Sequence, residues 1–331
     1  MDNFFKDKTI LCTGGSGSWG NELTKQLLEK EPKKVIIFSR GELAQVNMER
    51  KFKNDKLHFM IGDVRDFDAI NRACKGVDYV FHLAALKHVP VCENHPQEAI
   101  KTNIDGTTNL INACIDNDVK KLIDVSTDKA VSPTNLYGMT KAVGEKLTIQ
   151  ANQLTNNTDF VCIRGGNVLG SNGSVVPYFI DQIKRFNKVT VTDDTMTRYF
   201  LTLPESIELL FQAAEFSVGG ETYVMNMPSF YIMDLAKVIV KHYGDSDTKI
   251  EIIGLREGEK IDELLISEHE SKTTYEFNEN YYVILPELKI NRDYSHIDKT
   301  KKVNFKTFSS ADNIKDDEYL YKLLNKGNFL I

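Results

Sequence analysis

Four side chains capable of acid–base chemistry lie between residues 128 and 141. Asp128 and Lys129 are adjacent, and Tyr137 precedes Lys141 by four residues. On a helix this spacing places the phenol and the ammonium on the same face. Because a nearby cation lowers the pKa of a phenol, such a tyrosine can remove the proton of a sugar hydroxyl while a hydride leaves the same carbon. Asp128 and Lys129 would supply a second acid and base, which a simple dehydrogenase does not need.

Each of these residues also has a structural explanation. With 13 tyrosines and ordinary lysine usage, about one Tyr-x-x-x-Lys is expected by chance, and only Tyr137 has a lysine four positions later. Asp128 could be a helix N-cap or a turn residue, and Lys129 a solvated charge. Their position directly after an apolar run favours catalysis, since parallel sheets bind ligands at the carboxyl ends of their strands.

The elements that must position these residues begin with a glycine-rich turn. Gly14, Gly17 and Gly20 follow a strand-like run, Thr9–Thr13, and open the first amphipathic stretch. Glycines here allow a tight turn, let the backbone approach a pyrophosphate and let the helix pack on the strand. The free N–H groups of a helix N-terminus attract phosphate. The order of strand, turn and helix favours nucleotide binding over a plain turn.

The end of the second strand-like run indicates which dinucleotide binds. NAD-preferring sites usually place Asp or Glu there for the ribose hydroxyl, whereas this chain has Ser39 and Arg40, which suit a 2′-phosphate. We therefore expect NADP, although Arg40 could also be an ordinary exposed charge. Asp63, followed by Val64, could accept a hydrogen bond from the adenine amino group or cap a helix.

Small and polar residues follow the later runs. Ala84 and Ala85 end the fourth run, and their size would let the chain pass close to a dinucleotide. Asn103 lies in the next helical stretch and is either a cofactor contact or a solvated or capping residue.

Composition and charge exclude several classes of function. The net charge of −6 and the pI near 5.7 argue against nucleic acid or an anionic membrane as the main partner. No apolar run is long enough to span a membrane, and the N-terminus does not read as a signal peptide. The five cysteines show no Cys-x-x-Cys spacing, so we expect buried thiols in a reducing cytoplasm and no metal site.

The first half of the chain alternates strand-like and helix-like segments. The strand-like runs are Thr9–Thr13, Val35–Ser39, His58–Ile61, Tyr79–Leu83, Leu122–Ser126 and Phe160–Ile163. The amphipathic stretches are Gly20–Lys30, Glu42–Phe52, Phe67–Cys74, Pro96–Asn117 and Met139–Gln153. Near-continuous apolar strands that alternate with helices predict an α/β fold with a doubly wound parallel sheet, covered on both faces.

After Arg164 the pattern changes. Residues 165–173 are turn-rich, and the segments predicted beyond them are helices at Val176–Asn187, Pro204–Ser217 and Ile232–Tyr243, and strands at Val189–Thr192, Tyr223–Met227 and Ile250–Ile253. We expect a Rossmann domain over residues 1–165, to which about 200–230 return. A smaller α/β substrate lobe would then comprise about 166–199 and 231–331.

With these residues assembled, the chain resembles the extended short-chain dehydrogenase/reductase superfamily over nearly its whole length. Within it, the chain is similar to the inverting UDP-N-acetylglucosamine 4,6-dehydratases of bacterial glycan synthesis. The matching motifs are TGGSGSWG at 13–20, GDVRD at 62–66, AALKHVP at 84–90, KTN at 101–103, STDKA at 126–130, GSVVP at 173–177, MTR at 196–198 and GEK at 258–260. Retaining dehydratases resemble this family but carry Asp-Glu in place of Asp128-Lys129.

The resemblance implies a mechanism. Tyr137, held by Lys141 and near Thr127, would deprotonate the C4 hydroxyl while the C4 hydride passes to NADP. Lys129 would remove the C5 proton, which the C4 ketone has made acidic, and Asp128 would protonate the departing C6 hydroxyl. Hydride returns to C6, and C5 inverts if its proton returns on the opposite face. The cofactor is therefore recycled without net redox change.

The resemblance also assigns the site residues. The implied cofactor contacts are Thr13, Gly14, Ser16, Gly17, Ser18, Trp19, Gly20, Ser39, Arg40, Asp63, Val64, Leu83, Ala84, Ala85, Asn103, Tyr137, Lys141 and Val168. The implied substrate contacts are Lys87, His88, Asn167, Val176, Arg198, Arg256 and Glu259. Arg198 and Arg256 would bind the diphosphate, because guanidinium groups match phosphate oxygens.

The sequence departs from the family at three positions. Gly165 stands where many members have an aromatic residue, Asn172 where they have Arg, and Trp19 where Phe is more usual. Gly165 would enlarge the wall beside the substrate, and Asn172 would remove a charge. These changes leave open a variant that stops at a 5,6-ene or that does not invert C5.

Two other functions compete with dehydration of a UDP-sugar. An epimerase of the same superfamily needs Tyr137 and Lys141 but not Asp128 and Lys129. An NADP-binding sensor typically lacks the catalytic Tyr or Lys, and this chain has both. The family further suggests a homo-oligomer, for which the helices within Gly106–Asn117 and Met139–Gln153 could form the interface.

Overall fold

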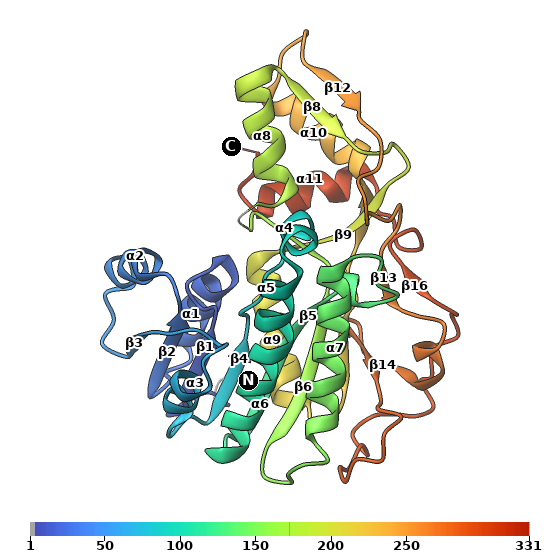
Figure 1. Ribbon diagram of the computed structural model, residues 1–331. Coiled ribbons are helices and arrows are strands. Elements are labelled where there is room, and N and C mark those ends of the chain that lie inside the picture. Colours follow the sequence, from blue (N-terminus) through green and yellow to red (C-terminus); the bar gives the residue numbers. More distant parts are fainter. Residues whose placement is uncertain (1–3, 172, 331) are drawn as a thin grey trace.

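A large, mostly parallel sheet forms the body of the molecule (Figure 1). The computed structural model describes residues 4–171 and 173–330, and within them nine strands form this sheet in the order β14-β15-β10-β6-β5-β4-β1-β2-β3. In that order the strands are Thr274–Asn278, Tyr281–Ile284, Thr222–Met225, Asp159–Gly165, Lys121–Thr127, Tyr79–His82, Thr9–Thr13, Lys34–Ser39 and Leu57–Ile61. The seven strands from β10 to β3 pair in parallel, and β15 and β14 add antiparallel pairs at one edge.

Helices cover both faces of the sheet. On one face α3 packs on α6 and α6 on α7, and on the other face α1 packs on α9. Their bounds are Ser18–Glu29 (α1), Phe67–Cys74 (α3), Gly106–Asp116 (α6), Leu136–Ala151 (α7) and Leu203–Phe216 (α9), with α2 at Glu42–Phe52 beside the outer strands. Each face has its own apolar core, with Leu23 and Phe211 on one side and Ile70 and Leu110 on the other. The predicted doubly wound α/β fold is confirmed.

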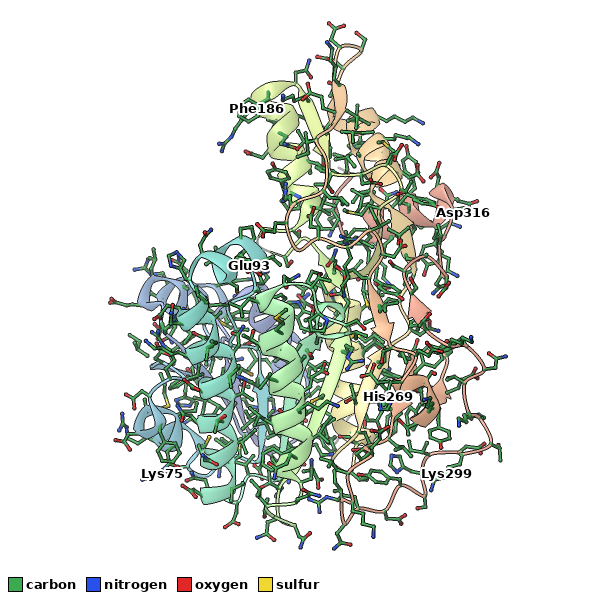
Figure 2. All side chains as sticks on the ribbon, turned by 45° about the vertical axis from the view of Figure 1, so that its right-hand side comes forward. Lys75, Glu93, Phe186, His269, Lys299 and Asp316 are labelled. Carbon is green, nitrogen blue, oxygen red and sulfur yellow. The ribbon has the colours of Figure 1, made fainter. Side chains whose placement is uncertain are left out.

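A smaller lobe stands above the carboxyl ends of the strands (Figure 1). It contains α8 (Val175–Phe186), β8 (Lys188–Val191), α10 (Ile232–Tyr243), β12 (Lys249–Ile252) and α11 (Asp317–Lys326). These elements share a third apolar core. In Figure 2, Phe186 and Asp316 lie in this lobe, and Lys75 lies at the opposite end of the molecule.

Short elements connect the body to the lobe. A small sheet is formed by β7 (Asn167–Leu169), β9 (Thr197–Thr202) and β11 (Ser229–Tyr231), and β13 (Leu264–Ile266) pairs with β16 (Phe308–Ser309). The remaining pieces are α4 (Val89–Asn94), α5 (Pro96–Ile100), the π-helical turn η1 (Lys101–Asp105) and the 3₁₀ turns η2 (Asp128–Ala130) and η3 (Glu270–Thr273). The predicted helix Pro96–Asn117 is therefore α5, η1 and α6 in series.

Two segments differ from the expectation. The β14–β15 hairpin was assigned to the substrate lobe with residues 231–331, but it extends the central sheet next to β10. Tyr281 and Val283 of β15 are fully buried in the core of the body, which accounts for this placement. Residues 165–173, expected to be turn-rich, also include β7, because Val168 and Leu169 are buried and pair with β9.

None of the helices in the described residues is long and apolar enough to cross a membrane. The five cysteines are buried, and all are free thiols. Burial raises the pKa of Cys12, Cys114 and Cys162, so these thiols stay protonated.

Candidate functional site

A cavity of about 880 Å³ lies between the carboxyl ends of the parallel strands and the lobe. Most of the predicted site residues line it. The predicted residues that line it are Gly14, Ser16, Gly17, Ser18, Trp19, Ser39, Arg40, Asp63, Val64, Leu83, Ala84, Ala85, Lys87, His88, Thr127, Lys129, Tyr137, Lys141, Asn167 and Val168. The location agrees with the rule that open α/β sheets bind ligands beyond the carboxyl ends of their strands.

The glycine-rich turn has the shape that a dinucleotide requires. Gly14 has a φ of +66°, and a Cβ there would lie 2.8 Å from Cα of Ala84. A Cβ on Gly20 would clash with the carbonyl of Gly15, so only glycine lets α1 start this close to the turn. Helix α1 has Gly17 at its N-cap, with no side-chain cap and no acidic residue in its first turn. Its N–H groups are therefore available to a phosphate.

The residues expected to select the cofactor form a polar cluster at the end of the cavity. Ser16 Oγ donates to Ser39 Oγ at 2.9 Å, which joins the glycine-rich turn to the end of β2. Arg40 is 54% exposed, and its Nη1 lies 3.8 Å from Asp63 Oδ2. Arg65 donates twice to Asp63, through Nε at 2.8 Å and Nη2 at 2.6 Å. The Asp63 carboxylate is thus largely committed to Arg65, and the cap of α3 is Asp66 instead.

Three predicted cofactor residues lie behind the cavity wall. Asn103 Oδ1 accepts from Leu86 N at 2.8 Å and its Nδ2 donates to Leu86 O at 3.0 Å, which fixes the loop after β4. Thr13 Oγ1 bonds His82 Nδ1 at 2.7 Å. Gly20 packs on the glycine-rich turn as described above. In this structure these residues shape the wall of the site, and their expected contacts with the cofactor stay predictions.

Tyr137 and Lys141 share the first two turns of α7, as the spacing predicted. The helix starts at Leu136, because the Asn135 side chain caps it by accepting from Gly138 N at 2.9 Å. Burial raises the pKa of Tyr137, and the charges of Lys141 and Lys129 offset only part of this effect. The predicted lowering by Lys141 is therefore present but smaller than the effect of burial.

Lys141 has a partner that the sequence analysis missed. Its Nζ donates to Asp124 Oδ1 at 3.0 Å, and both side chains are buried. Burial lowers the pKa of Lys141, but the charge and hydrogen bond of Asp124, together with Tyr137, outweigh it, so the net pKa is raised. The only signal in the sequence was a single carboxylate inside the apolar run that forms β5.

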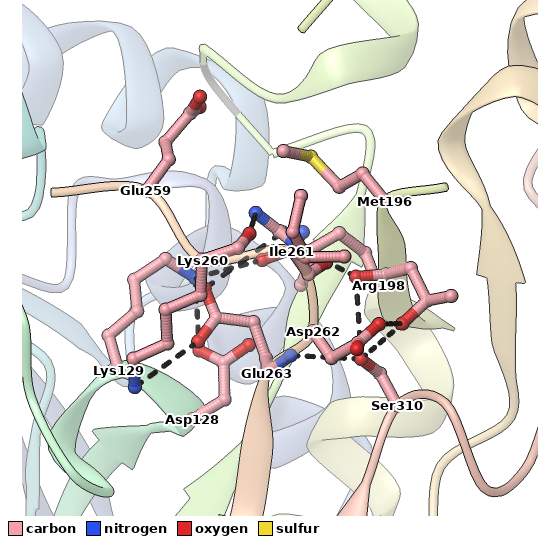
Figure 3. A network of polar contacts seen from close by, with 12 residues as sticks. Asp128, Lys129, Met196, Arg198, Glu259, Lys260, Ile261, Asp262, Glu263 and Ser310 are labelled. Atoms are coloured by element: carbon pink, nitrogen blue, oxygen red, sulfur yellow. Dashed lines mark hydrogen bonds and ion pairs between the residues drawn. The ribbon is translucent and has the colours of Figure 1, made fainter. Parts of the chain in front are cut away.

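Asp128 and Lys129 follow β5 in the turn η2 (Figure 3). Lys129 Nζ donates to Asp128 Oδ1 at 3.0 Å, and Thr127 Oγ1 donates to the same oxygen at 2.8 Å. Asp128 is completely buried, and its two hydrogen-bond partners, Thr127 and Lys129, line the cavity. Asp128 Oδ2 has no hydrogen-bond partner among the described residues.

Glu263 is a second buried carboxylate in this network (Figure 3). Its Oε1 lies 3.7 Å from Lys129 Nζ and 3.9 Å from Arg198 Nε, and its Oε2 lies 3.9 Å from Lys260 Nζ. Burial raises the pKa of Glu263, partly offset by Lys129. Burial lowers the pKa of Lys129, but Asp128 and Glu263 outweigh it and raise the pKa overall. Glu263 has no local signal in the sequence, since it lies in the segment after the GEK motif without a pattern of its own.

Three residues that were expected to contact the substrate, Lys87, His88 and Asn167, line one part of the cavity. Lys129 Nζ donates to Asn167 Oδ1 at 3.4 Å, which joins the turn η2 to the start of β7. A Cβ on Gly173 would lie 2.8 Å from His88 Cε1, so the loop before α8 closes over His88. Burial lowers the pKa of Lys87.

Four predicted substrate residues do not line the cavity. Arg198 is buried and donates to the carbonyls of Thr197 and Ile261 through Nη1 and of Lys260 through Nη2. In this structure its guanidinium holds the 260–261 segment, and the expected contact with a diphosphate stays a prediction. Val176 belongs to the buried core of the lobe.

Arg256 and Glu259 lie in a loop at the edge of the site. Arg256 is exposed, and its backbone N–H donates to Glu259 Oε2 at 3.1 Å. This loop docks beside the catalytic turn, because Gly258 O accepts from Thr134 Oγ1 at 3.0 Å and Asn135 Nδ2 at 3.1 Å. The structure therefore places both residues near the site without bringing their side chains into the cavity.

Gly165 does not enlarge the cavity. It is buried in β6, and a Cβ there would lie 3.0 Å from Met225 Sδ and 3.8 Å from Met227 Sδ. The two methionines fill the space that a larger side chain would occupy, which corrects the expectation of a freer wall. Asn172 lies outside the described residues.

Comparison with known proteins adds independent information. The family described as polysaccharide biosynthesis protein matches residues 10–285. UDP-N-acetylglucosamine 4,6-dehydratase (inverting) of Campylobacter jejuni strain 81-176 is 46% identical over 290 residues, which is 86% of this chain and 85% of that protein. UDP-glucose 4-epimerase of Rickettsia canadensis is 41% identical over 90% of this chain and 89% of its own length.

Solved structures agree with the fold. Pen from Bacillus thuringiensis superposes with a TM-score of 0.92 at 38% identity and covers 99% of this chain and 100% of its own. DesIV, a dTDP-glucose 4,6-dehydratase from Streptomyces venezuelae solved with NAD bound, has a TM-score of 0.70 at 22% identity. It covers 76% of this chain and 86% of its own, and this similarity is one of fold alone.

Proposed function

The chain belongs to the polysaccharide biosynthesis protein family, within the extended short-chain dehydrogenase/reductase superfamily, and on this premise we propose that it is a UDP-N-acetylglucosamine 4,6-dehydratase. The product would be a UDP-4-keto-6-deoxy sugar with C5 inverted. The observation that carries the proposal is the Asp128–Lys129 contact of 3.0 Å beside the cavity that Tyr137 and Lys141 also line. Oxidation at C4 needs only Tyr137 and Lys141, whereas elimination of water needs a further acid and base.

The site fits a nicotinamide dinucleotide. Gly14 and the uncapped N-terminus of α1 would hold the pyrophosphate, and Ser39 and Arg40 would face the adenosine ribose. We propose NADP, because Arg40 lines the cavity where a 2′-phosphate would lie, and because the Asp63 carboxylate is already hydrogen-bonded to Arg65. When bound, the nicotinamide would take a hydride from C4 and return one to C6.

The reaction needs four proton transfers: one from the C4 hydroxyl, one from C5, one to the departing C6 oxygen, and one back to C5 on the opposite face as the hydride returns to C6. Tyr137 takes the proton of the C4 hydroxyl. In the resting structure Lys129 is an ammonium beside the Asp128 carboxylate, so a proton transfer across their 3.0 Å contact gives the amine and the acid that elimination needs. Lys129 then removes the C5 proton, and Asp128 gives its proton, with Thr127 as the connecting hydroxyl, to the C6 oxygen that leaves as water.

Proton NMR of the holoenzyme with UDP-N-acetylglucosamine in D₂O tests this function. A 4-keto-6-deoxy product with deuterium at C5 and altered ring couplings is the expected result. Replacement of Asp128 by Asn should abolish it. Retained C5 configuration or an exocyclic 5,6-alkene would overturn the assigned product, and an unchanged spectrum would overturn the substrate.

A 4-epimerase is the second candidate, because the relative from Rickettsia canadensis carries that name at 41% identity. The same NMR experiment separates the two. An epimerase would give the C4 epimer with its C6 hydroxyl intact, and Asp128→Asn would leave that activity in place.

We also propose that the protein forms a homo-oligomer through α6 and α7. These helices lie against each other on one face of the sheet, and Met139 and Val143 of α7 are 46% and 43% exposed. Large apolar side chains exposed on a helix pair are typical of an interface. Light scattering of the wild type and of Val143→Glu would test it, with a smaller particle expected for the variant.

A further inference from the structure

A carboxylate lies in the middle of the central sheet, where the proposed mechanism gives it no role. Asp124 belongs to β5 and stands in register with His82 of β4 on one side and Cys162 of β6 on the other. Its side chain is completely buried. A buried carboxylate is unfavourable unless it is paired, so its presence needs an explanation.

Lys141 is the cation that pairs with Asp124. Lys141 Nζ lies 3.0 Å from Asp124 Oδ1, and Asp124 Oδ2 has no hydrogen-bond partner among the described residues. Gly144, one turn after Lys141 on α7, places no side chain over this oxygen; a Cβ there would lie 4.0 Å away. The carboxylate is therefore directed at the lysine alone.

The titratable residues in register with Asp124 on the neighbouring strands, His82 and Cys162, are neutral. Thr107 Oγ1 donates to Asn103 O at 2.8 Å, so it must accept from His82 Nε2–H at 3.1 Å, and His82 Nδ1 accepts from Thr13 Oγ1 at 2.7 Å. Burial lowers the pKa of His82 to about 4, so the ring carries no charge.

Cys162, on the opposite side, is a buried thiol whose pKa is raised by burial and by Asp124. On the cavity side, the charged neighbours of the Tyr137 phenol are Lys141, Lys129 and Asp128. Lys141 is thus the group that joins Asp124 to the phenol.

Tyr137 and Lys141 compete for one proton. Their unperturbed pKa values, about 10 and 10.4, are nearly equal, so loss of one proton from the buried pair can leave either a phenolate with an ammonium or a phenol with an amine. Only the phenolate can accept the C4 hydroxyl proton. Something in the fold must favour that arrangement.

We propose that Asp124 is a positioning residue that keeps Lys141 charged, so that the proton released on activation comes from Tyr137. The carboxylate contacts the ammonium directly and reaches the phenol only through it. It therefore stabilises the charged lysine more than it destabilises the phenolate. This inference rests on the proposed function only for its activity readout.

Replacement of Asp124 by Asn removes the charge and keeps the shape. Without the carboxylate the buried pair carries one uncompensated positive charge, so it releases its proton at lower pH. Burial then favours release from Lys141, which leaves Tyr137 protonated and inactive. The acid limb of the pH–turnover profile of the holoenzyme should move down by about one pH unit or more, and the plateau should fall about tenfold or more.

The matched control is Asp159→Asn. Asp159 is an aspartate on the adjacent strand β6, but it pairs with Arg292 at 3.1 Å and does not line the cavity. Its profile should match the wild type. For Asp124→Asn, an unmoved limb would overturn the proposal, whatever the plateau. A moved limb with a full plateau would also overturn it, because Lys141 would then keep its proton unaided.

A second measurement does not depend on the substrate. The ultraviolet absorbance of tyrosinate, taken as the difference between each protein and its Tyr137→Phe counterpart, reports the phenolate directly. The first proton lost by the wild-type pair should appear as tyrosinate, and the first lost by Asp124→Asn should not. Equal tyrosinate signals would overturn the inference, whereas a wild type that fails to dehydrate UDP-N-acetylglucosamine would overturn only the proposed function.

If Asp124→Asn does not fold, Asp124→Ala serves as the second variant. If both fail, thermal unfolding of Lys141→Met is compared with Lys141→Met/Asp124→Asn. The single variant leaves a buried carboxylate unpaired, so the double variant should unfold at a higher temperature. A double variant no more stable than the single one would overturn the proposal that the two charges are coupled.

Discussion

Glu263 Oε1 lies 3.7 Å from Lys129 Nζ, so the ammonium faces a second buried carboxylate besides Asp128. The two residues are brought together by the 260–261 segment, which Arg198 holds through the carbonyls of Lys260 and Ile261. The proposed reaction requires Lys129 to act as a base, and this contact opposes the loss of its proton. Glu263 therefore sets the pH at which the amine becomes available.

Replacement of Glu263 by Gln should shift the pH dependence of C5 deprotonation. Glu263 raises the pKa of Lys129, so its removal lowers that pKa and the neutral amine forms at lower pH. The rising limb of C5 deuterium incorporation should move down by about one pH unit. The rate of incorporation, followed by NMR across a pH series, measures it.

Glu257→Gln is the control, since Glu257 is exposed in the preceding loop and carries the same charge. For this control, the rising limb of C5 deuterium incorporation should stay at the wild-type pH. A limb for Glu263→Gln that coincides with the wild type would show that Glu263 does not govern Lys129.

Replacement of Gly138 by Ala should disrupt the catalytic turn. A Cβ at Gly138 would clash with the backbone carbonyl of Lys129, which must then move. Displacement of a catalytic group by about 1 Å can cost about a hundredfold in rate, so turnover should fall by one to two orders of magnitude. Crowding should also lower stability by roughly 1–3 kcal/mol. Turnover and thermal unfolding measure the two effects.

Gly144→Ala on the same helix is the matched variant. A Cβ there would first meet Asn103 O at 3.6 Å, an ordinary contact. Because alanine favours helix over glycine, its stability should equal or exceed that of the wild type by up to about 1 kcal/mol. If Gly138→Ala were as active as Gly144→Ala, the prediction that the clash displaces the Lys129 backbone would be contradicted.

Replacement of Arg40 by Ala should weaken NADP binding selectively. The guanidinium lines the cavity beside Ser39 and forms only a long contact, 3.8 Å, with Asp63. Loss of a charge-assisted contact to a 2′-phosphate should reduce the affinity for NADP on the order of tenfold and leave NAD binding unchanged. Titration of each dinucleotide by fluorescence measures the ratio. Arg50→Ala, in the last turn of α2, controls for a general loss of positive charge. Equal effects on both dinucleotides would contradict the predicted preference.

The parts of the site that follow from local spacing could be predicted from the sequence. Gly14, Gly17 and the start of α1 depend on one strand–turn–helix unit, and Tyr137 and Lys141 depend on one helix. Each of these arrangements involves neighbouring residues, so period and turn chemistry suffice to place them.

The parts that depend on tertiary packing could not be predicted. Asp124 contacts Lys141 because β5 lies under α7. Glu263 contacts Lys129 although the two residues are far apart in the sequence. Arg198 has the residue type of a phosphate ligand, but the fold uses its donors for carbonyls. No strand is predicted from the sequence at residues 274–284, because the pairing of the β14–β15 hairpin with β10 depends on the packing of Tyr281 and Val283 in the core of the body.

Acid should destabilise the protein through Glu270. This carboxylate accepts from Arg164 Nη2 at 2.9 Å and from Ser267 N at 2.9 Å, while Arg164 also pairs with Glu145 at 2.6 Å. Burial raises the pKa of Glu270, but Arg164 and these hydrogen bonds outweigh it and lower the pKa to about 2. The folded-state pKa lies below the unfolded value of 4.5, so the stabilisation is fully present above pH 4.5 and is lost as the pH falls towards 2.

Replacement of Glu270 by Gln should remove this pH dependence. A shift of this size corresponds to about 3 kcal/mol, so the variant should be less stable than the wild type at neutral pH by up to that amount. The difference should shrink steadily below pH 4.5, because the unfolded wild-type chain then binds a proton at this carboxyl, whereas the folded chain binds it only near pH 2. Urea unfolding at a series of pH values measures it, with the exposed Glu276→Gln on β14 as the control. A constant difference across the series would show that Glu270 stabilises the fold by packing and not by its charge, since only the charge is titrated in this range.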